Sequence, residues 1–325
     1  MSASAAIVRP RRAGFVVSQE WLLLAALVAV FVVVGLINPR FVATRNLQTI
    51  LLGNAYIAVA AIGMTMVIIS GNIDISVGSL IGVLASVSGS LAVAGVPVVL
   101  SWLIPIAVSI IVMLFQGALI AYLRIPSIVV TLGMLSILKG GLISVTNGAW
   151  ISNLPPSYHL AQWMLFDLIP MPVFFMIVLT VGAAWWMRNT VSGRSIYAVG
   201  GNSEAARLCG MPRERTLMMV FAIHGAFIGL AAVLFATQLS VIQSTVPSNL
   251  ELTIITASVV GGVSILGGTG TVVGSTLAAI LIAAIGSSLI FVNISPFWLR
   301  AVQGFLILGT VLADIYRRRR RGLAR

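Results

Sequence analysis

Short polar side chains gather at residues 71–79, between two long apolar runs. Asn72, Asp74 and Ser76 stand at alternate positions, with a glycine on each side of the group. Such side chains cap helices, and inside a membrane an ionisable group is costly and is usually functional. We expect a break between two helices in which Asp74 or Ser76 caps a helix that begins near Val77. The break can be a capped turn at the cytoplasmic end of two spans, a gating or packing element, or a contact with solute.

A second group, residues 261–270, is dense in glycine and is followed by Gly274 and Ser275. Glycine adopts backbone conformations that other residues avoid, and small residues let chain segments approach closely. A phosphate-binding loop would need a lysine directly after the glycines, and none follows here. We therefore expect close packing around a sharp re-entry, with Gly261 and Gly262 as candidates for a gate.

The polar stretch at residues 188–216 lies between two apolar runs. Its charged residues are Arg188, Arg194, Glu204, Arg207, Arg213, Glu214 and Arg215. Asn202 or Ser203 can cap a short helix, Glu204 suits the positive end of that helix, and Gly210 with Pro212 ends it. The stretch is either a solvated connector or a docking surface for a soluble partner.

Other reactive side chains are scarce. Cys209 is the single cysteine, so no disulfide can form within the chain, and His159 and His224 are too few for a metal cluster. A membrane enzyme would need paired acids, a metal cluster or a nucleophile with a base. His224 is the best candidate for such chemistry, but it has no partner visible in the sequence, which favours core packing. The only lysine, Lys139, is outside any nucleotide-binding motif, so we expect no bound cofactor and leave ATP and Mg²⁺ to a partner chain.

These residues are set in a chain that is too apolar for a soluble domain. Hydrophobic residues make up 59%, charged residues only 8%, and the mean hydropathy is +1.12, whereas soluble domains carry about 25% charged residues. Because the long apolar runs do not alternate, helices rather than barrel strands are expected to cross the membrane. Breaks in the runs predict spans at 21–37, 47–69, 77–94, 98–121, 126–146, 168–187, 217–237, 252–266, 270–290 and 298–315. We expect an all-α membrane protein of about ten transmembrane helices, in which residues 261–274 can instead form a broken or re-entrant segment.

The basic residues predict the orientation of these spans. With a cytoplasmic N-terminus, that side holds Arg9, Arg11, Arg12, Arg124, Arg188, Arg194, Arg207, Arg213, Arg215, Arg317 to Arg321 and Arg325. The other face keeps only Arg40, Arg45 and Arg300, an asymmetry that the positive-inside rule favours. We expect a cytoplasmic segment at 1–20, a permease domain at 21–316 and a basic cytoplasmic tail at 317–325. The tail abuts a span and is expected to contact anionic lipid rather than nucleic acid.

The motifs taken together resemble a known family. They are Gly71 to Ser79, Thr131-Leu132-Gly133, Gly193-Arg194 through Gly200-Gly201-Asn202 with Glu204-Ala205-Ala206-Arg207, and Gly261-Gly262 to Gly274. In this order, over nearly the whole chain, they are similar to the membrane permease subunits of ribose-type ABC sugar importers. Asn72 departs from the family, which commonly has a second glycine there, but asparagine tolerates the left-handed conformation of such a turn. Residues 124–126, 139–140, 148–151 and 250–251 look nearer the branch that imports autoinducer-2 or rhamnose.

The resemblance implies a permease in the bacterial inner membrane that pairs with a second, identical or related permease. Two cytoplasmic ATP-binding subunits would drive alternating access, and a periplasmic solute-binding protein would deliver a sugar or sugar-like solute. The loop at 201–212 would be the coupling helix on the ATPase, with Gly201, Asn202, Glu204, Ala205, Ala206, Arg207 and Gly210 as interface residues. The candidates for the pathway or its gate are Asn72, Asp74, Ser76, Gly78, Thr131, Gly261 and Gly262.

Polar residues in or near the spans are further candidates for the solute path, although each is more typical of helix packing: Asn54, Thr65, Ser70, Gln116, Ser136 and Gln303. Glu251 and Asp167 are expected on the periplasmic side, where they could bind the solute receptor. Two other classes of transporter stay open. An ion-coupled secondary transporter would need intramembrane acids, of which only Asp74 qualifies, and an ABC permease for branched-chain amino acids would share the family's fold.

Overall fold

The computed structural model describes residues 18–165, 169–245, 247 and 249–320. Ten helices correspond to the predicted spans: α1 Gln19–Ile37, α2 Thr44–Ile69, α3 Val77–Val93, α4 Val98–Ala121, α5 Ser127–Thr146, α6 Met171–Asn189, α9 Arg213–Ala236, α10 Leu250–Val260, α11 Val272–Phe291 and α12 Trp298–Arg320. The remaining elements are α7 Val191–Gly201, α8 Ser203–Leu208, the 3-10 turns η1 Pro39–Val42, η2 Pro156–Tyr158 and η3 Leu160–Gln162, and the strands β1 Trp150–Ile151, β2 Met164–Leu165, β3 Ile169–Pro170 and β4 Ile242–Gln243. The predicted all-α membrane fold is confirmed.

Two of the ten helices are too short to cross a bilayer alone. Eight helices are long and apolar enough to span a membrane, whereas α3 and α10 are shorter apolar helices of 17 and 11 residues. The predicted eighth span, 252–266, is therefore wrong at its end. Helix α10 stops at Val260 because two glycines follow, and Gly262 takes the left-handed φ of +94° that suits glycine. Eleven residues at 1.5 Å each cover about 16 Å, roughly half of the hydrocarbon thickness.

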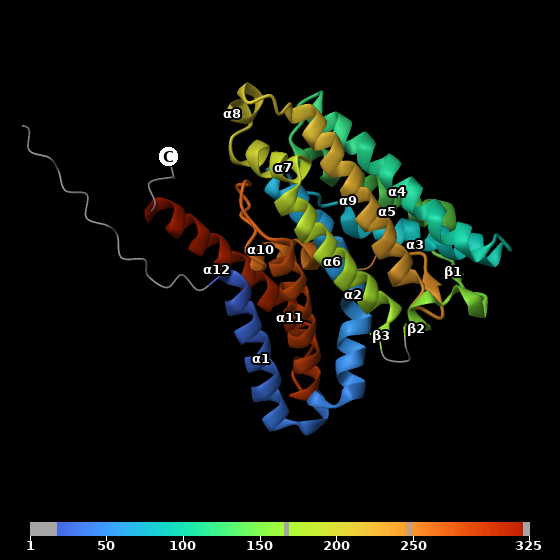
Figure 1. Cartoon of the computed structure of the whole chain (residues 1–325). Coiled ribbons are helices and arrows are strands. Elements are labelled where there is room, and N and C mark those ends of the chain that lie inside the picture. Colours follow the sequence, from blue (N-terminus) through green and yellow to red (C-terminus); the bar gives the residue numbers. More distant parts are fainter. Residues whose placement is uncertain (1–17, 166–168, 246, 248, 321–325) are drawn as a thin grey trace, which may run out of the picture.

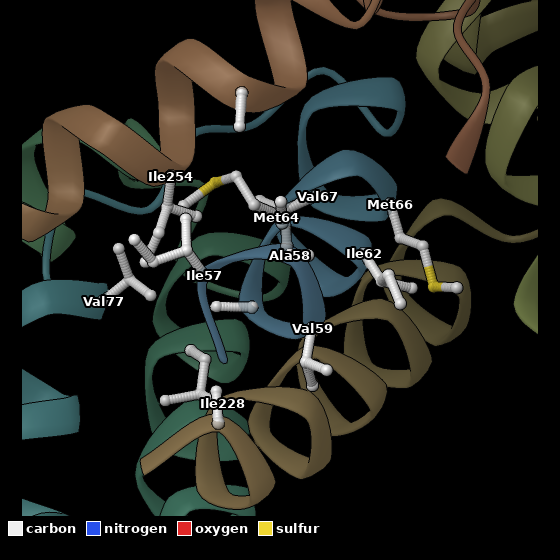
Figure 2. Packing of buried hydrophobic residues seen from close by; sticks show 14 of the residues in the cluster. Ile57, Ala58, Val59, Ile62, Met64, Met66, Val67, Val77, Ile228 and Ile254 are labelled. Atoms are coloured by element: carbon white, nitrogen blue, oxygen red, sulfur yellow. The ribbon is translucent and has the colours of Figure 1, made fainter. Parts of the chain in front are cut away.

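Helix α2 forms the centre of the bundle. Its residues 57–69 are all buried, and the helix packs against α9, α11, α10 and α6. A helix that is apolar all round belongs in an interior, whereas α1 and α12 leave most of their apolar side chains uncovered, as membrane-facing helices do. Figure 2 shows the packing around α2, where Ile57 lies near Ile254 of α10; Val59 and Ile62 of α2 and Ile228 of α9 belong to the same buried cluster.

Small residues allow α4 and α9 to approach each other closely. A Cβ atom at Gly229 of α9 would lie 2.5 Å from the Cα atom of Ile106, and one at Gly225 would lie 2.8 Å from that of Ile110. Between membrane helices such close approach supplies the van der Waals contact that the hydrophobic effect cannot supply. Helix α9 is thereby held rigidly beside α4, which fixes the position of any functional residue that it carries.

The two ends of the bundle differ. At one end lie α7 and α8, and at the other lie the α1–α2 connection and the short strand pairs, in which Trp150 pairs with Gln243 and Met164 with Pro170 (Figure 1). The start of α1 and the last turns of α12 share the α7 end, because Gln19 and Asp314 both contact the loop at 261–266. This agrees with the prediction that the termini and the stretch 188–216 share one side. Residues 1–17 and 321–325, which hold Arg9, Arg11, Arg12, Arg321 and Arg325, lie outside the described residues, as does Asp167.

Candidate functional site

The stretch 188–216 contains two short helices rather than the single one predicted. Helix α7 was missed. Its N-cap is Thr190, whose hydroxyl oxygen accepts from the backbone N–H of Gly193 at 3.0 Å, and its apolar residues Ile196 and Val199 are buried against the bundle. Those two residues are three positions apart, as on one face of a helix, and together with the capping threonine they are the signal that could have identified it.

Helix α8 follows directly and confirms the predicted short helix. The side-chain oxygen of Asn202 accepts from the backbone N–H groups of Glu204 at 3.1 Å and Ala205 at 3.0 Å, so Asn202 rather than Ser203 is the N-cap. Arg207 donates to the Glu204 carboxylate at 2.6 Å, and this bond holds the pKa of Glu204 below its usual range. Gly210, with φ of +79°, ends the helix as predicted.

Nearly every side chain of α8 faces away from the bundle. Only Ala206 is buried, whereas Leu208 is 80% exposed and Cys209 is also exposed. The exposed Glu204–Arg207 ion pair stabilises the helix little because water screens it. Helix α8 and the residues that flank it at 201–210 thus hold all seven residues predicted for the interface, and their role in docking stays a prediction.

Replacing Asn202 with alanine is expected to loosen α8 without loosening the bundle. The two N-cap hydrogen bonds are lost, which costs about 0.5–2 kcal/mol of local helix stability. Backbone amide exchange of residues 203–208 should become faster while the melting temperature of the protein stays the same. Ser203→Ala is the control, because Ser203 is the first helical residue and not the cap. Equal amide exchange in both variants would contradict the capping role.

Glycines join α7 to the centre of the bundle. We call Gly71, Gly200, Gly201, Gly267 and Gly268 the glycine junction. The backbone N–H of Gly268 donates to the carbonyl of Ile69, the last residue of α2, at 2.8 Å. A Cβ atom at Gly268 would lie 2.7 Å from the Cα atom of Gly201, and one at Gly200 would overlap the Ile69 carbonyl. The loop after α10, the end of α7 and the end of α2 therefore meet backbone to backbone.

The other glycines of this loop also make close contacts. Gly261, at the end of α10, would meet the Cα atom of Ser275 at 2.5 Å if it carried a Cβ atom, so α10 and α11 touch at this point. Gly262 packs against Gln19, and Tyr197 of α7 donates to the carbonyl of Gly270 at 3.1 Å. The predicted close packing is therefore confirmed among the described residues, whereas the predicted re-entry stays a prediction.

The break at residues 70–76 differs from its predicted form. Helix α3 begins at Val77 and Ser76 stands at its N-cap position, as expected, but the Ser76 side chain makes no capping hydrogen bond. Instead, one carboxylate oxygen of Asp74 accepts from the backbone N–H of Ser76 at 2.7 Å and from its hydroxyl at 2.6 Å. The position of the cap is confirmed, but a side-chain capping bond is not formed, because the Asp74 carboxylate closes a turn onto Ser76, a competing local bond that aspartate makes readily.

The second oxygen of Asp74 has a partner that sequence reasoning missed. His224, in the middle of α9, places its Nε2 atom 3.0 Å from Asp74 Oδ2, and both side chains are fully buried. Gln116 of α4 donates to the Ser76 hydroxyl at 3.1 Å. His224 is buried in the core, as predicted, but it has a partner there, and a buried polar network ties the break to α9 and α4.

The geometry of this network indicates where the imidazole proton lies. Nε2 faces a carboxylate oxygen, so this nitrogen carries the proton and donates, which is an assignment from the partner and not an observed hydrogen. Nδ1 is buried and has no hydrogen-bond partner among the described residues, and a Cβ atom at Gly63 of α2 would lie 2.6 Å from it. Asp74, Ser76, Gln116 and His224 thus form a tight cluster at the centre of the bundle.

The remaining predicted residues divide between the break and the helix contacts. Asn72 donates to the Ser70 hydroxyl at 3.1 Å, and Thr131 of α5 lies 3.4 Å from the carbonyl of Ile73, so both border the break. Gly78 contacts Glu251 at the start of α10.

Three of the polar candidates bond across helices. Thr65 donates to Ser275 at 2.6 Å, Gln303 to Thr253 at 3.1 Å, and Gln116 to Ser76, as helix packing predicts. Asn54, Ser70 and Ser136 bond to backbone carbonyls of their own segments. Among the described residues, no group of three or more His, Cys, Asp or Glu side chains could hold a metal ion.

The sequence matches transport permeases. Residues 46–311 match the family described as branched-chain amino acid transport system / permease component. The autoinducer 2 import system permease protein LsrC of Yersinia pseudotuberculosis serotype O:3 (strain YPIII) is 34% identical over 298 residues, which is 91% of this chain and 85% of the relative. The protein of the same name from Salmonella typhi is 34% identical over 297 residues, 91% of this chain and 86% of the relative. No solved structure matches the chain significantly.

Proposed function

The chain belongs to the membrane permeases of ribose-type ABC importers, and from that premise we propose that it carries autoinducer-2 or a related sugar-like solute into the cell. It would act in the bacterial inner membrane beside a second permease, with both termini and α8 in the cytoplasm. Separate cytoplasmic subunits would bind ATP and Mg²⁺, and a periplasmic binding protein would deliver the solute. The permease itself is a transport subunit and not an enzyme.

One observation carries this proposal more than any other. Helix α8 is capped, exposed and tipped by Leu208, yet it continues directly from α7, whose last residues are fixed to α2 through the glycine junction. A flexible surface connector would need no such attachment. An ATPase that moves α8 would move the end of α2 with it, because main-chain contacts without intervening side chains yield little.

The break after α2 supplies the next step. It begins at Gly71, which contacts Gly267 in the glycine junction, and it ends at Asp74 and Ser76, which are bonded to α9 and α4. Displacement of α2 is therefore delivered to a non-helical segment at the centre of the bundle. In the proposed alternating-access cycle this segment, with Asn72, Gly78 and Thr131 beside it, opens or closes the solute path.

The single thiol tests the docking proposal. Cys209 ends α8 and is exposed, so a membrane-impermeant maleimide should label it in inside-out vesicles and leave it unlabelled in intact spheroplasts. Labelling should rise after urea removes peripheral proteins, because a seated ATPase covers the thiol. Cys209→Ser is the blank. Labelling in spheroplasts would reverse the orientation, and unchanged labelling after stripping would refute docking at α8.

Uptake assays separate the alternatives. Asp74 and His224 form an ionisable pair within the spans, so a lack of ionisable groups does not argue against an ion-coupled transporter. The argument against ion coupling is the match to the ABC permease family. Loss of uptake with an uncoupler while cellular ATP stays high would favour an ion-coupled transporter. Competition by leucine rather than by autoinducer-2, ribose or rhamnose would favour an amino-acid permease.

A further inference from the structure

A polar cavity of about 300 Å³ lies in the half of the bundle farther from α8. Its polar lining comes from Ser79 of α3, Lys139 of α5, Asn249, Glu251 of α10 and Arg300 of α12. Leu135 and Pro247 complete it. Because these residues come from four helices and the turn before α10, the cavity is formed by the fold and not by one local loop.

Two opposite charges in this cavity lack ion-pair partners. Within the described part of the chain, neither Lys139 nor Glu251 has an opposite charge within 4.0 Å. Lys139 lies about 18 Å along α5 from its first residue, at 1.5 Å per residue, and is thus well inside a predicted span. Ionisable groups at such depth face water-filled cavities or one another, because contact with lipid costs several kcal/mol. The surface around Lys139 and Glu251 must therefore be in contact with water or with another polar group rather than with lipid.

The other polar groups are already oriented. With its amide oxygen turned toward Arg300, Asn249 accepts from the guanidinium Nε at 3.1 Å and Nη2 at 3.2 Å. Asn249 has a left-handed φ of +58°, which places it at the start of α10 beside Glu251. The lining therefore combines ammonium and guanidinium donors with a carboxylate acceptor, an amide and the Ser79 hydroxyl.

We propose that this cavity is a solute site on the translocation path and that it takes an uncharged polyhydroxylated solute. The inference rests on the proposed transport function and adds the binding residues. Hydroxyl groups both donate and accept, so they can bond to Glu251 and to Lys139 or Arg300 together. An anion would face Glu251, and a cation would face two positive groups. A branched-chain amino acid could pair its charges, but its side chain would find only Leu135 and Pro247 as apolar contacts.

The position of the cavity links it to the break. Gly78 lies one residue after the start of α3, and a Cβ atom there would lie 2.9 Å from the backbone nitrogen of Glu251. The first turns of α3 and α10 are thus in contact, and α3 follows directly on Asp74 and Ser76. Movement of the break shifts Ser79 and Glu251 relative to each other, which gives the site two shapes in the transport cycle.

The test uses Leu135→Cys as a sensor in the assembled transporter. Leu135 lines the cavity, while Ile137, two residues away on the same helix, is 66% exposed and does not line it. Charged methanethiosulfonate reagents are added outside spheroplasts. Leu135→Cys should react at least about tenfold faster than Ile137→Cys, because only a hydrated thiol ionises and meets a charged reagent. The parent chain, whose Cys209 faces the cytoplasm in the proposed orientation, is the blank.

Two further measurements in the Leu135→Cys background test the charges and the solute class. Lys139→Met should lower the ratio of the rates for the anionic and cationic reagents, and Glu251→Gln should raise it. Ribose or rhamnose should slow modification, whereas leucine and ribose 5-phosphate should not. The proposed solute class is overturned if only leucine or only ribose 5-phosphate slows the modification, or if none of the four compounds slows it.

The outcomes separate this proposal from the transport function itself. Equal reaction of Leu135→Cys and Ile137→Cys, in a complex that still co-purifies with its ATPase and hydrolyses ATP, would overturn the cavity and leave the importer intact. If neither Lys139→Met nor Glu251→Gln changes the ratio of the modification rates for the anionic and cationic reagents, Lys139 and Glu251 do not belong to the site. Failure to recover an ATPase with the chain would instead contradict the proposed function.

Discussion

Asp74→Ala is expected to lower the free energy of unfolding by about 2–6 kcal/mol, since it leaves two buried donors unpaired at about 1–3 kcal/mol each, and to abolish uptake. The Asp74 carboxylate accepts from the Ser76 backbone, the Ser76 hydroxyl and His224, all at 3.0 Å or less. Alanine leaves the Ser76 backbone N–H and His224 Nε2 without an acceptor in a fully buried site, while the Ser76 hydroxyl keeps only the Gln116 side-chain oxygen at 3.4 Å. Each buried donor left unpaired is costly. The break at 70–76 would also lose the bonds that fix it to α9.

The measurement is thermal unfolding of the purified variants in one detergent, together with solute uptake. Ser136→Ala is the matched control, because the Ser136 hydroxyl bonds only to its own helix and is exposed, so its loss should cost less than about 0.5 kcal/mol. His224→Gln should be milder than Asp74→Ala, since glutamine can still donate. If Asp74→Ala and Ser136→Ala unfold at the same temperature, the network does not stabilise the break.

The second large effect is expected at Gly200. Alanine should stabilise the isolated helix α7 by about 1 kcal/mol relative to glycine. Here the added methyl group would overlap the carbonyl oxygen of Ile69 and press on the backbone of Gly268. Both neighbours are main chain and cannot rotate away, so α7 must move off α2. We expect Gly200→Ala to reduce uptake at least about tenfold, equivalent to about 1.4 kcal/mol in the limiting step.

The control is Gly182→Ala in α6, where a Cβ atom would have no neighbour within 4 Å. The informative measurement is the number of solute molecules carried per ATP hydrolysed. Gly200→Ala should keep its ATPase subunits and much of their hydrolysis while uptake falls, since the change lies between α8 and the path. Full uptake in Gly200→Ala would refute transmission through the glycine junction, and loss of the ATPase from the complex would place the defect at docking instead.

Local sequence patterns predicted most of the helices, and long-range contacts explain what they missed. Apolar runs and their Gly, Pro and Asn breaks gave the helices, including the start of α3 at Val77 and the cap at Asn202. The partner of Asp74 lies 150 positions away in α9, and no periodicity or spacing connects the two. The early end of α10 depends on how Gly261 packs against Ser275. The glycines alone could not decide whether this region forms a full span or a re-entrant segment.

Helix α7 and the polar cavity around Lys139 and Glu251 likewise depend on contacts that local sequence patterns do not reveal. Helix α7 carries too few apolar residues to be recognised as a span, and its burial comes from the bundle beneath it. From the sequence, Arg300 enters only the charge asymmetry, and Lys139 only the absence of a nucleotide-binding motif and the family resemblance. Glu251 enters only that resemblance and a possible receptor contact. Only the packing of α3, α5, α10 and α12 brings them to one cavity.

The shortness of α3 and α10 bears on how such a carrier can stay tight to ions. Both helices begin within the bundle, and their first turns touch at Gly78 and Glu251, so two amino-terminal dipole ends, each worth roughly +0.5 charge, meet there. With Lys139 and Arg300 nearby, they outweigh the single carboxylate of Glu251 and give the proposed path a positive potential. Protons and sodium ions are driven inward by about 2.3 kcal/mol per 100 mV of membrane voltage, and positive helix ends repel them as they do in water channels. A neutral solute would meet no such barrier, so under the proposed function the cell would import it without discharging its membrane.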